Sequence, residues 1–179
     1  MTTAIIISAN GFIDLSLKCL ESLAFHTVDY RTYFQDGVPQ HLVTSTWNRQ
    51  LIDAVDDGCE AAVVLNNDCR VTEGWLAPLL QGLDHYDLVG PTSNSAGGYP
   101  RQTREAPRGA GKQDGYTPTS MLNGFCLCAE IEWWERYLFD DTLFLGCEDE
   151  LIIRSKARCA VAHASYVHHV GGATRGTHA

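Results

Sequence analysis

The residues best suited to chemistry follow an unbroken apolar run, Ala61 to Leu65, which stops at Asn66, Asn67 and Asp68. Such a run predicts a strand buried on both faces, and a strand of an open α/β sheet delivers the residues after its carboxyl end to the ligand site. Asn66 and Asp68 point the same way if the extended conformation continues. A carboxylate there is a hard ligand for Mg²⁺ or Mn²⁺, and such an ion could hold a diphosphate. The alternative is an Asx-rich turn that closes the strand.

A cluster of carboxylates opens an expected helix near the C-terminus. The helix is predicted from Glu148 to Lys156, and Asp149 and Glu150 also fall in its first turn. The helix dipole stabilises carboxylates at this end, so a capping role is the simplest interpretation. Clustered carboxylates also occur where a protein transfers protons, so both interpretations stay open.

Two adjacent histidines, His168 and His169, end the last expected strand, which begins at about Ala160. Side chains alternate across a strand, so at most one of the two should point into a site. A single histidine is more often an ordinary surface or core residue. The position of this pair just before Gly171 and Gly172 favours a functional role.

The elements that must position these residues alternate along the first half of the chain. Expected strands lie at 4–8, 31–35, 61–65 and 87–90, and expected helices end near Phe25, Gly58 and Leu83. The expected helix caps are Asp14 or Ser16, Ser45 or Thr46, and Thr72, and Pro91 is expected to close the fourth strand. This alternation predicts βαβ units on a mostly parallel sheet, an α/β fold.

The character of the chain changes between Ser93 and Thr119. Glycine and proline there mix with four cations, which are Arg101, Arg104, Arg108 and Lys112. This composition predicts a long loop, and long loops in compact domains are usually functional or disordered. In so acidic a chain, the four cations indicate either contact with an anionic ligand or simple solvation. A strand is expected next, over 121–129, with Cys126 and Cys128 on one face.

Bulk composition predicts one globular domain. The chain has 179 residues, 45% hydrophobic and 20% charged, with a formal net charge of -9. This charge argues against a general binder of nucleic acid or anionic membranes. The seven cysteines are odd in number and form no CxxC pair, which favours reduced thiols in a cytosolic protein. Since neither a signal peptide nor a stretch of transmembrane length is recognisable, we expect a cytoplasmic location.

Taken in order, these segments resemble family 2 inverting glycosyltransferases of the GT-A fold, most closely the rhamnosyltransferase-like members. The segments that carry the resemblance are Ile5-Ile6-Ile7 with Asn10-Gly11; Lys18 to Leu23; Asn48 with Ala54; Leu65-Asn66-Asn67-Asp68 with Thr72 and Gly74-Trp75-Leu76; Val89-Gly90-Pro91 with Ser93-Asn94; Gly124-Phe125-Cys126; Phe139-Asp140, Gly146 and Glu148-Asp149; and His169-Val170-Gly171-Gly172. No single segment is specific, but their order spans nearly the whole chain. The region after Asp36 is shorter than in the family.

The resemblance implies a single Rossmann-like domain over 1–179. Its donor-binding half covers about 1–92, a flexible basic loop covers about 93–119, and the acceptor-side half covers about 120–179. The implied activity is hexosyl transfer from a UDP-, dTDP- or GDP-linked sugar to an acceptor hydroxyl. The implied acceptor-side residues include Gly124 and Phe125.

The resemblance also implies roles for donor-side residues. Asp68 would ligate Mn²⁺ or Mg²⁺ at the diphosphate, with His169, or alternatively His168, completing the metal site. Asp36 would accept a hydrogen bond from the nucleobase, and Asn66 would bond the ribose or a phosphate. The remaining donor-side candidates are Asn10, Asn48, Asn67 and Arg175.

An inverting displacement needs one general base opposite the leaving diphosphate. The acid cluster aligns with the family in two ways, which makes Asp149 the first choice and Glu148 the second. Two other functions compete: a nucleotidyltransferase of similar fold, which usually carries a basic, glycine-rich loop after its first strand, and a catalytically inactive nucleotide-sugar-binding module. The acceptor stays open, with nucleic acid disfavoured by the charge.

Overall fold

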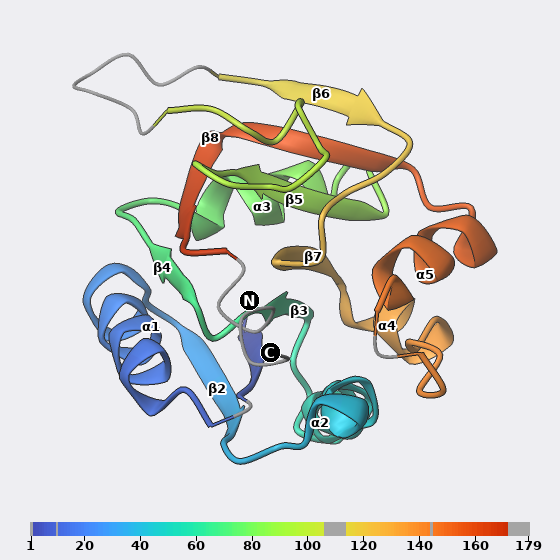
Figure 1. Ribbon diagram of the computed structural model, residues 1–179. Helices are drawn as coiled ribbons and strands as arrows, with labels where there is room; N and C mark the ends of the chain where they lie inside the picture. Colours follow the sequence, from blue (N-terminus) through green and yellow to red (C-terminus); the bar gives the residue numbers. More distant parts are fainter. Residues whose placement is uncertain (1, 10, 106–113, 144, 172–179) are drawn as a thin grey trace.

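The computed structural model describes residues 2–9, 11–105, 114–143 and 145–171, which form a sheet with helices on both faces (Figure 1). The strands are β1 (Thr3–Ser8), β2 (Tyr30–Gln35), β3 (Ala61–Leu65), β4 (Cys69–Val71), β5 (Leu88–Thr92), β6 (Tyr116–Thr119), β7 (Cys126–Glu130) and β8 (Cys159–His169). The helices are α1 (Ile13–His26), η1 (Gln40–Leu42, a 3-10 turn), α2 (Val43–Asp56), α3 (Leu76–Gly82), α4 (Ile131–Arg136) and α5 (Cys147–Ser155). The α/β class and the strands β1, β2, β3 and β5 agree with the prediction, whereas β4 was not predicted.

The sheet is mixed, which corrects the expectation of a mostly parallel one. Its order is β2-β1-β3-β7-β5-β8-β4, with β6 also paired to β8. Among the described strands, only the pairs β1–β2, β1–β3 and β5–β8 are parallel. Strand β7 runs antiparallel to both β3 and β5, and β4 and β6 run antiparallel to β8. Hydrophobic patterns identify a strand but do not encode its direction, so the sequence could not reveal these reversals.

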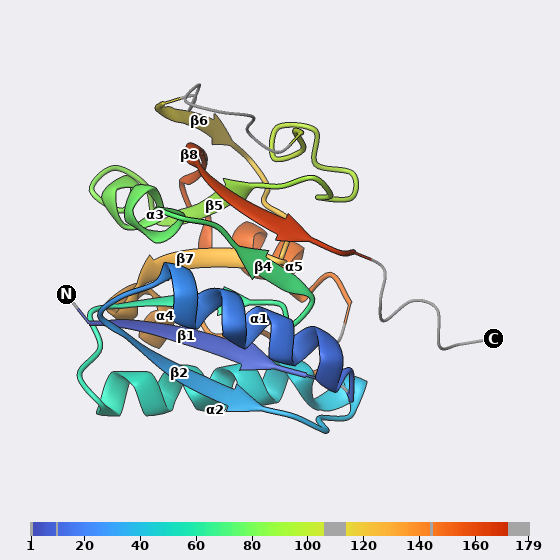
Figure 2. The ribbon, with the colours of Figure 1, turned by 90° about the vertical axis from the view of Figure 1, so that its left-hand side faces the viewer.

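Two apolar layers hold the helices to the sheet (Figure 2). Helices α2, α4 and α5 bury residues against one face, together with Ile6, Val64 and Leu127. Helices α1 and α3 cover the other face, which carries Ile5 and Val63. Cys126 and Cys128 share that second face as predicted, because alternate side chains of a strand point the same way. All seven cysteines are buried and free.

The predicted helix caps are wrong. Helix α1 begins at Ile13 and α2 at Val43, and neither has a side-chain cap. The Ser16 hydroxyl donates to the Phe12 carbonyl, and the Ser45 and Thr46 hydroxyls donate to the Leu42 carbonyl. Asp14 lies inside the first turn of α1. Each hydroxyl thus bonds a carbonyl at the start of its helix instead of capping the backbone amides.

Two other predicted boundaries, the start of the helix after Thr72 and the end of the strand at Pro91, also differ from the observed ones. Thr72 does not cap α3; its hydroxyl donates to the Tyr166 carbonyl of β8 at 2.7 Å. Pro91 lies inside β5 rather than closing it, and its register partner is Ala162. In both places a tertiary contact, rather than local capping or a break, determines the backbone.

The described parts of the expected loop between Ser93 and Thr119 contain regular structure and a buried side chain. Residues 116–119 form strand β6, and the side chain of Gln102 is buried. Arg101 donates to the Pro118 carbonyl, and the Arg104 guanidinium lies 5.9 Å from the centre of the Tyr166 ring. Two of the four cations are therefore held by the protein itself, while Arg108 and Lys112 fall outside the described residues.

Within the described ranges, no helix combines the length and apolar character needed to cross a membrane.

Candidate metal centre and active site

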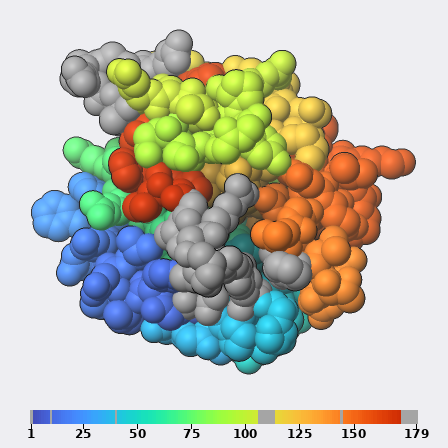
Figure 3. Space-filling model, viewed as in Figure 1, coloured from blue at the N-terminus to red at the C-terminus, as the bar shows by residue number. Residues whose placement is uncertain are grey.

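Five strands of the mixed sheet deliver their carboxyl ends to one edge. Strands β1, β2 and β3 are mutually parallel, β5 is parallel to β8, and β3 and β5 are both antiparallel to β7. The residues that follow β3, β5 and β8 therefore meet at this edge, and the start of the reversed β7 lies there too. Figure 3 views this side of the molecule, with the red end of β8 and the orange α5 region on either side of the centre.

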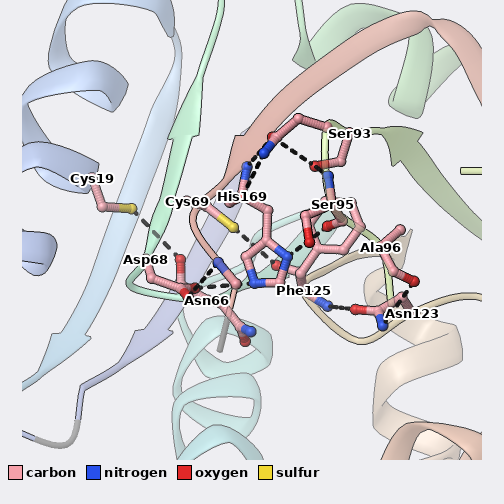
Figure 4. A network of polar contacts seen from close by, with 12 residues as sticks. Cys19, Asn66, Asp68, Cys69, Ser93, Ser95, Ala96, Asn123, Phe125 and His169 are labelled. Carbon is pink, nitrogen blue, oxygen red and sulfur yellow. Dashed lines mark hydrogen bonds and ion pairs between the residues drawn. The ribbon is translucent and has the colours of Figure 1, made fainter. Parts of the chain in front are cut away.

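Asp68 and His169 meet at this edge. The pairing of β4 with β8 sets Cys69 opposite His169, which brings the turn after β3 to the end of β8. The His169 Nε2 atom lies 3.3 Å from the Asp68 Oδ1 atom (Figure 4). The other oxygen of Asp68, Oδ2, accepts a hydrogen bond from the Gly171 amide at 3.2 Å. His168 is exposed and pairs with Arg70 in the ladder, so only one of the two histidines turns toward Asp68.

The ring of His169 is fixed on several sides. Its Nδ1 atom lies 2.8 Å from the Ser95 carbonyl, and its ring stacks on Phe125 with centroids 4.9 Å apart. The Asn94 side chain bonds both the amide and the carbonyl of the His169 backbone. Burial lowers the pKa of His169, but the hydrogen bond to Asp68, the Asp68 charge and the Ser95 contact outweigh it, so the pKa lies above the usual 6.5.

This arrangement fits a divalent cation. When Nε2 gives up the proton that it shares with Asp68, a proton on Nδ1, donated to Ser95, leaves the Nε2 lone pair facing the Asp68 carboxylate. Two adjacent ligands on an octahedral ion, each about 2.1 Å from it, lie about 3 Å apart. The 3.3 Å separation of Nε2 and Oδ1 is close to that value. The carboxylate oxygen suits Mn²⁺ or Mg²⁺, while an imidazole nitrogen is typical of transition-metal sites, which favours Mn²⁺ of the two.

The sequence reasoning missed Cys69 as a neighbour of this centre. Its sulfur lies with the Asp68 and His169 donors in one group, all within 4.8 Å of one another. Burial, followed by the charge of Asp68, holds the pKa of the Cys69 thiol well above its usual value. A protonated thiol is a poor ligand for hard ions, so Asp68 and His169 are the better donors for Mn²⁺ or Mg²⁺. The available signal was that Cys69 directly follows Asp68.

Asn66 and Asn67 occupy a turn, because the extended conformation ends at Leu65. The backbone of Asn66 donates to the Phe125 carbonyl at 2.9 Å and its carbonyl accepts from the Cys69 amide. The buried Asn67 side chain donates to the Ser16 hydroxyl of α1 at 3.0 Å. The extended alternative, in which Asn66 and Asp68 would point the same way, is therefore wrong, and the structure has the Asx-rich turn that was the other alternative. Asn67 anchors the turn against α1.

The other donor-side candidates lie in different parts of the structure. Asn48 bonds the backbone of Phe139 through both amide atoms, each at 2.9 Å, so it joins α2 to the chain after α4. Asp36 is exposed directly after β2, at the edge where the parallel strands end. Asn10 and Arg175 fall outside the described residues.

Glu148 and Asp149, called the acid pair below, lie in the first turn of α5 and border the same site. A Cβ added at Gly124 would lie 3.0 Å from the Glu148 carboxyl carbon, so the Glu148 side chain packs directly on this glycine. The next residue, Phe125, stacks on His169. Asp149 accepts a hydrogen bond from the Tyr99 hydroxyl at 2.6 Å. Gly124 and Phe125, the two residues just before β7, thus contact Glu148 and His169 respectively.

Neither a protein-family model nor a curated protein matches the sequence. Solved structures match through their fold. S. aureus TarS 1-349 in complex with UDP aligns with a TM-score of 0.65 and 12% identity, over 94% of this chain and 60% of that one. GalNAc-T7 with UDP, GalNAc and Mn²⁺ aligns with a TM-score of 0.68 and 12% identity, over 94% of this chain and 43% of that one. A197 from STIV aligns with a TM-score of 0.66 and 14% identity, over 94% and 85%.

The fold is therefore that of the GT-A glycosyltransferases, the class to which TarS and GalNAc-T7 belong. The chain spans 60% of the TarS 1-349 chain. Identities of 12–14% establish the architecture, and function has to be argued from the site.

Proposed function

We propose that the protein is a metal-dependent, inverting glycosyltransferase of family 2 type that uses a nucleotide-diphosphate sugar. The observation that carries this proposal is the Asp68–His169 pair, in which Nε2 faces Oδ1 at 3.3 Å while Nδ1 is held by a carbonyl. The pair stands at the sheet edge where a GT-A fold binds its donor. A bound divalent ion stabilises the charge that develops on a leaving diphosphate.

The residues around the pair have separate roles in this proposal. Asp68 and His169 hold Mn²⁺ or Mg²⁺. Asp36, exposed after the end of β2, accepts a hydrogen bond from the nucleobase. Asn66, two residues before Asp68, bonds the ribose or a phosphate of the donor. Gly171 adds a backbone donor to Asp68 and keeps the end of β8 close to it.

The transfer itself is a single displacement at the anomeric carbon. The acceptor oxygen forms a bond to that carbon as the bond to the diphosphate oxygen breaks, and the hydroxyl proton passes to a carboxylate. Asp149 is the proposed base and Glu148 the second choice, because both lie in the first turn of α5 and Glu148 packs on Gly124, next to the Phe125 that stacks on His169. Inversion follows from attack on the face opposite the leaving group.

UDP-linked donors are the first to test, since TarS was solved with UDP and with UDP-GlcNAc, and GalNAc-T7 with UDP and Mn²⁺. dTDP- and GDP-linked sugars complete the set. We propose a cytoplasmic location, where such donors are made, and leave the acceptor unassigned.

A thermal-shift series tests the proposal with UDP, dTDP and GDP, each with and without Mn²⁺. Ligand at a hundred times its dissociation constant stabilises a protein by about 2.7 kcal/mol, which for a chain of this length raises Tm by about 5–10 °C. The rise should need both the metal and one nucleotide, and should disappear in Asp68→Asn and His169→Gln.

His168→Gln is the matched control, because His168 is an exposed neighbour on the same strand. It should retain the full rise in Tm. A rise that is independent of metal, or equal in all three variants, would contradict the proposed site. Metal-dependent binding without any turnover of the nucleotide sugar would favour the inactive binding module instead.

A further inference from the structure

The hydroxyl of Tyr99 donates a hydrogen bond of 2.6 Å to Oδ1 of Asp149. Burial, the hydrogen bond to Asp149 and the charges of Asp149 and Glu148 all raise the pKa of Tyr99. The phenol therefore stays protonated and acts as the donor in this bond. Among the described residues, the structure contains no other hydrogen bond to the Asp149 carboxylate.

The backbone around Tyr99 is fixed independently of Asp149. The side chain of Gln102 is buried, with 1% of the residue exposed. Its oxygen accepts a hydrogen bond from the backbone N–H of Asn123 at 2.7 Å, and its nitrogen donates to the Pro91 carbonyl at 3.1 Å. The backbones of Ser93 and Gln102 also bond each other at 2.7 Å. The position of the Tyr99 hydroxyl is therefore set by bonds that do not involve Asp149.

The same segment contacts the metal-binding side of the site. Ser95 accepts from His169, and Asn94 bonds the His169 backbone. Tyr99, four residues after Ser95, contacts the acid pair. Residues 93–103 thus join the end of β8 to the start of α5, two elements that approach the site from different sides.

We propose that Tyr99 is a positioning residue for the general base. Its hydrogen bond to Oδ1 of Asp149 leaves Oδ2 free to take the proton of the sugar acceptor's hydroxyl. This inference rests on the proposed glycosyl transfer. In the step, the acceptor oxygen bonds to the anomeric carbon, the bond to the diphosphate breaks, and the proton moves to Oδ2. Tyr99 keeps its own proton throughout.

The test compares Tyr99→Phe with Tyr116→Phe. Tyr116 is the matched control because it is also partly buried and its hydroxyl donates to the Pro78 carbonyl at 2.8 Å. This hydrogen bond does not involve the acid pair. Nucleoside-diphosphate release from UDP-GlcNAc, UDP-glucose, dTDP-rhamnose and GDP-mannose is measured with Mn²⁺. Loss of a hydrogen bond to a charged group should lower kcat about tenfold or more in Tyr99→Phe, with KM for the nucleotide sugar unchanged.

The control should keep the wild-type kcat. Asp149→Asn should lose more kcat than Tyr99→Phe does, and the double variant should be no slower than Asp149→Asn, because Tyr99 acts through that carboxylate. Wild-type kcat in Tyr99→Phe, or an equal loss in both tyrosine variants, overturns the positioning role while nucleotide binding still supports the proposed function. A wild-type protein that neither binds nor cleaves any of these donors overturns both.

Discussion

Gln102 should contribute more to stability than its place in a glycine- and proline-rich loop indicates. The variant Gln102→Leu keeps a similar volume but leaves the Asn123 amide and the Pro91 carbonyl without their partner. Each polar group left unpaired in a buried place costs about 1–3 kcal/mol. Because Asn123 is only partly buried, we expect the unfolding free energy to fall by about 2–4 kcal/mol.

Urea denaturation measures this loss, and thermal unfolding should show a Tm lower by about 4–16 °C. Gln81→Leu is the control, since Gln81 is exposed on α3 and should change the unfolding free energy by no more than about 0.5 kcal/mol. A Gln102→Leu variant within 1 kcal/mol of wild type, on the scale expected for unpaired buried groups, would refute the view that this side chain holds residues 93–103 in place.

Two further predictions concern the acid pair and the dependence of stability on pH. Gly124→Ala places a Cβ 3.0 Å from the Glu148 carboxyl carbon, so it should displace Glu148 and reduce turnover. Urea denaturation should show an unfolding free energy lower by about 1 kcal/mol. Gly98→Ala, whose Cβ meets nothing within 4 Å, should change neither the turnover nor the unfolding free energy. Hydrogen bonds from Arg158 hold the pKa of Asp87 below the usual 3.8. The stabilisation by this pair is therefore present above pH 3.8 and is lost as pH falls through the lower folded-state pKa. Asp87→Asn should be less stable than wild type at pH 7, with the difference closing in acid; an equal difference at pH 7 and pH 2 would contradict this assignment.

The positions of the strands were largely readable from the sequence. The runs at Ala4 to Ser8 and Ala61 to Leu65 are buried throughout, and burial is what an unbroken apolar pattern encodes. The start of α5 was readable to within one residue, but those of α1 and α2 were not, since Ser16 and Thr46 bond carbonyls at the helix start instead of capping it. A serine or threonine satisfies either arrangement locally, and packing against the sheet selects between them.

The sequence by itself determined the α/β class, the buried strands, and the presence of a carboxylate and a histidine at strand ends. Tertiary structure alone decided that His169, and not His168, faces Asp68, because the β4–β8 pairing fixes the face. It also decided that Tyr99 meets Asp149. Side-chain patterns report which residues are buried, a property of each short segment. Strand direction and the partners of a polar atom depend on segments far apart in the chain, so they emerge only when those segments pack together.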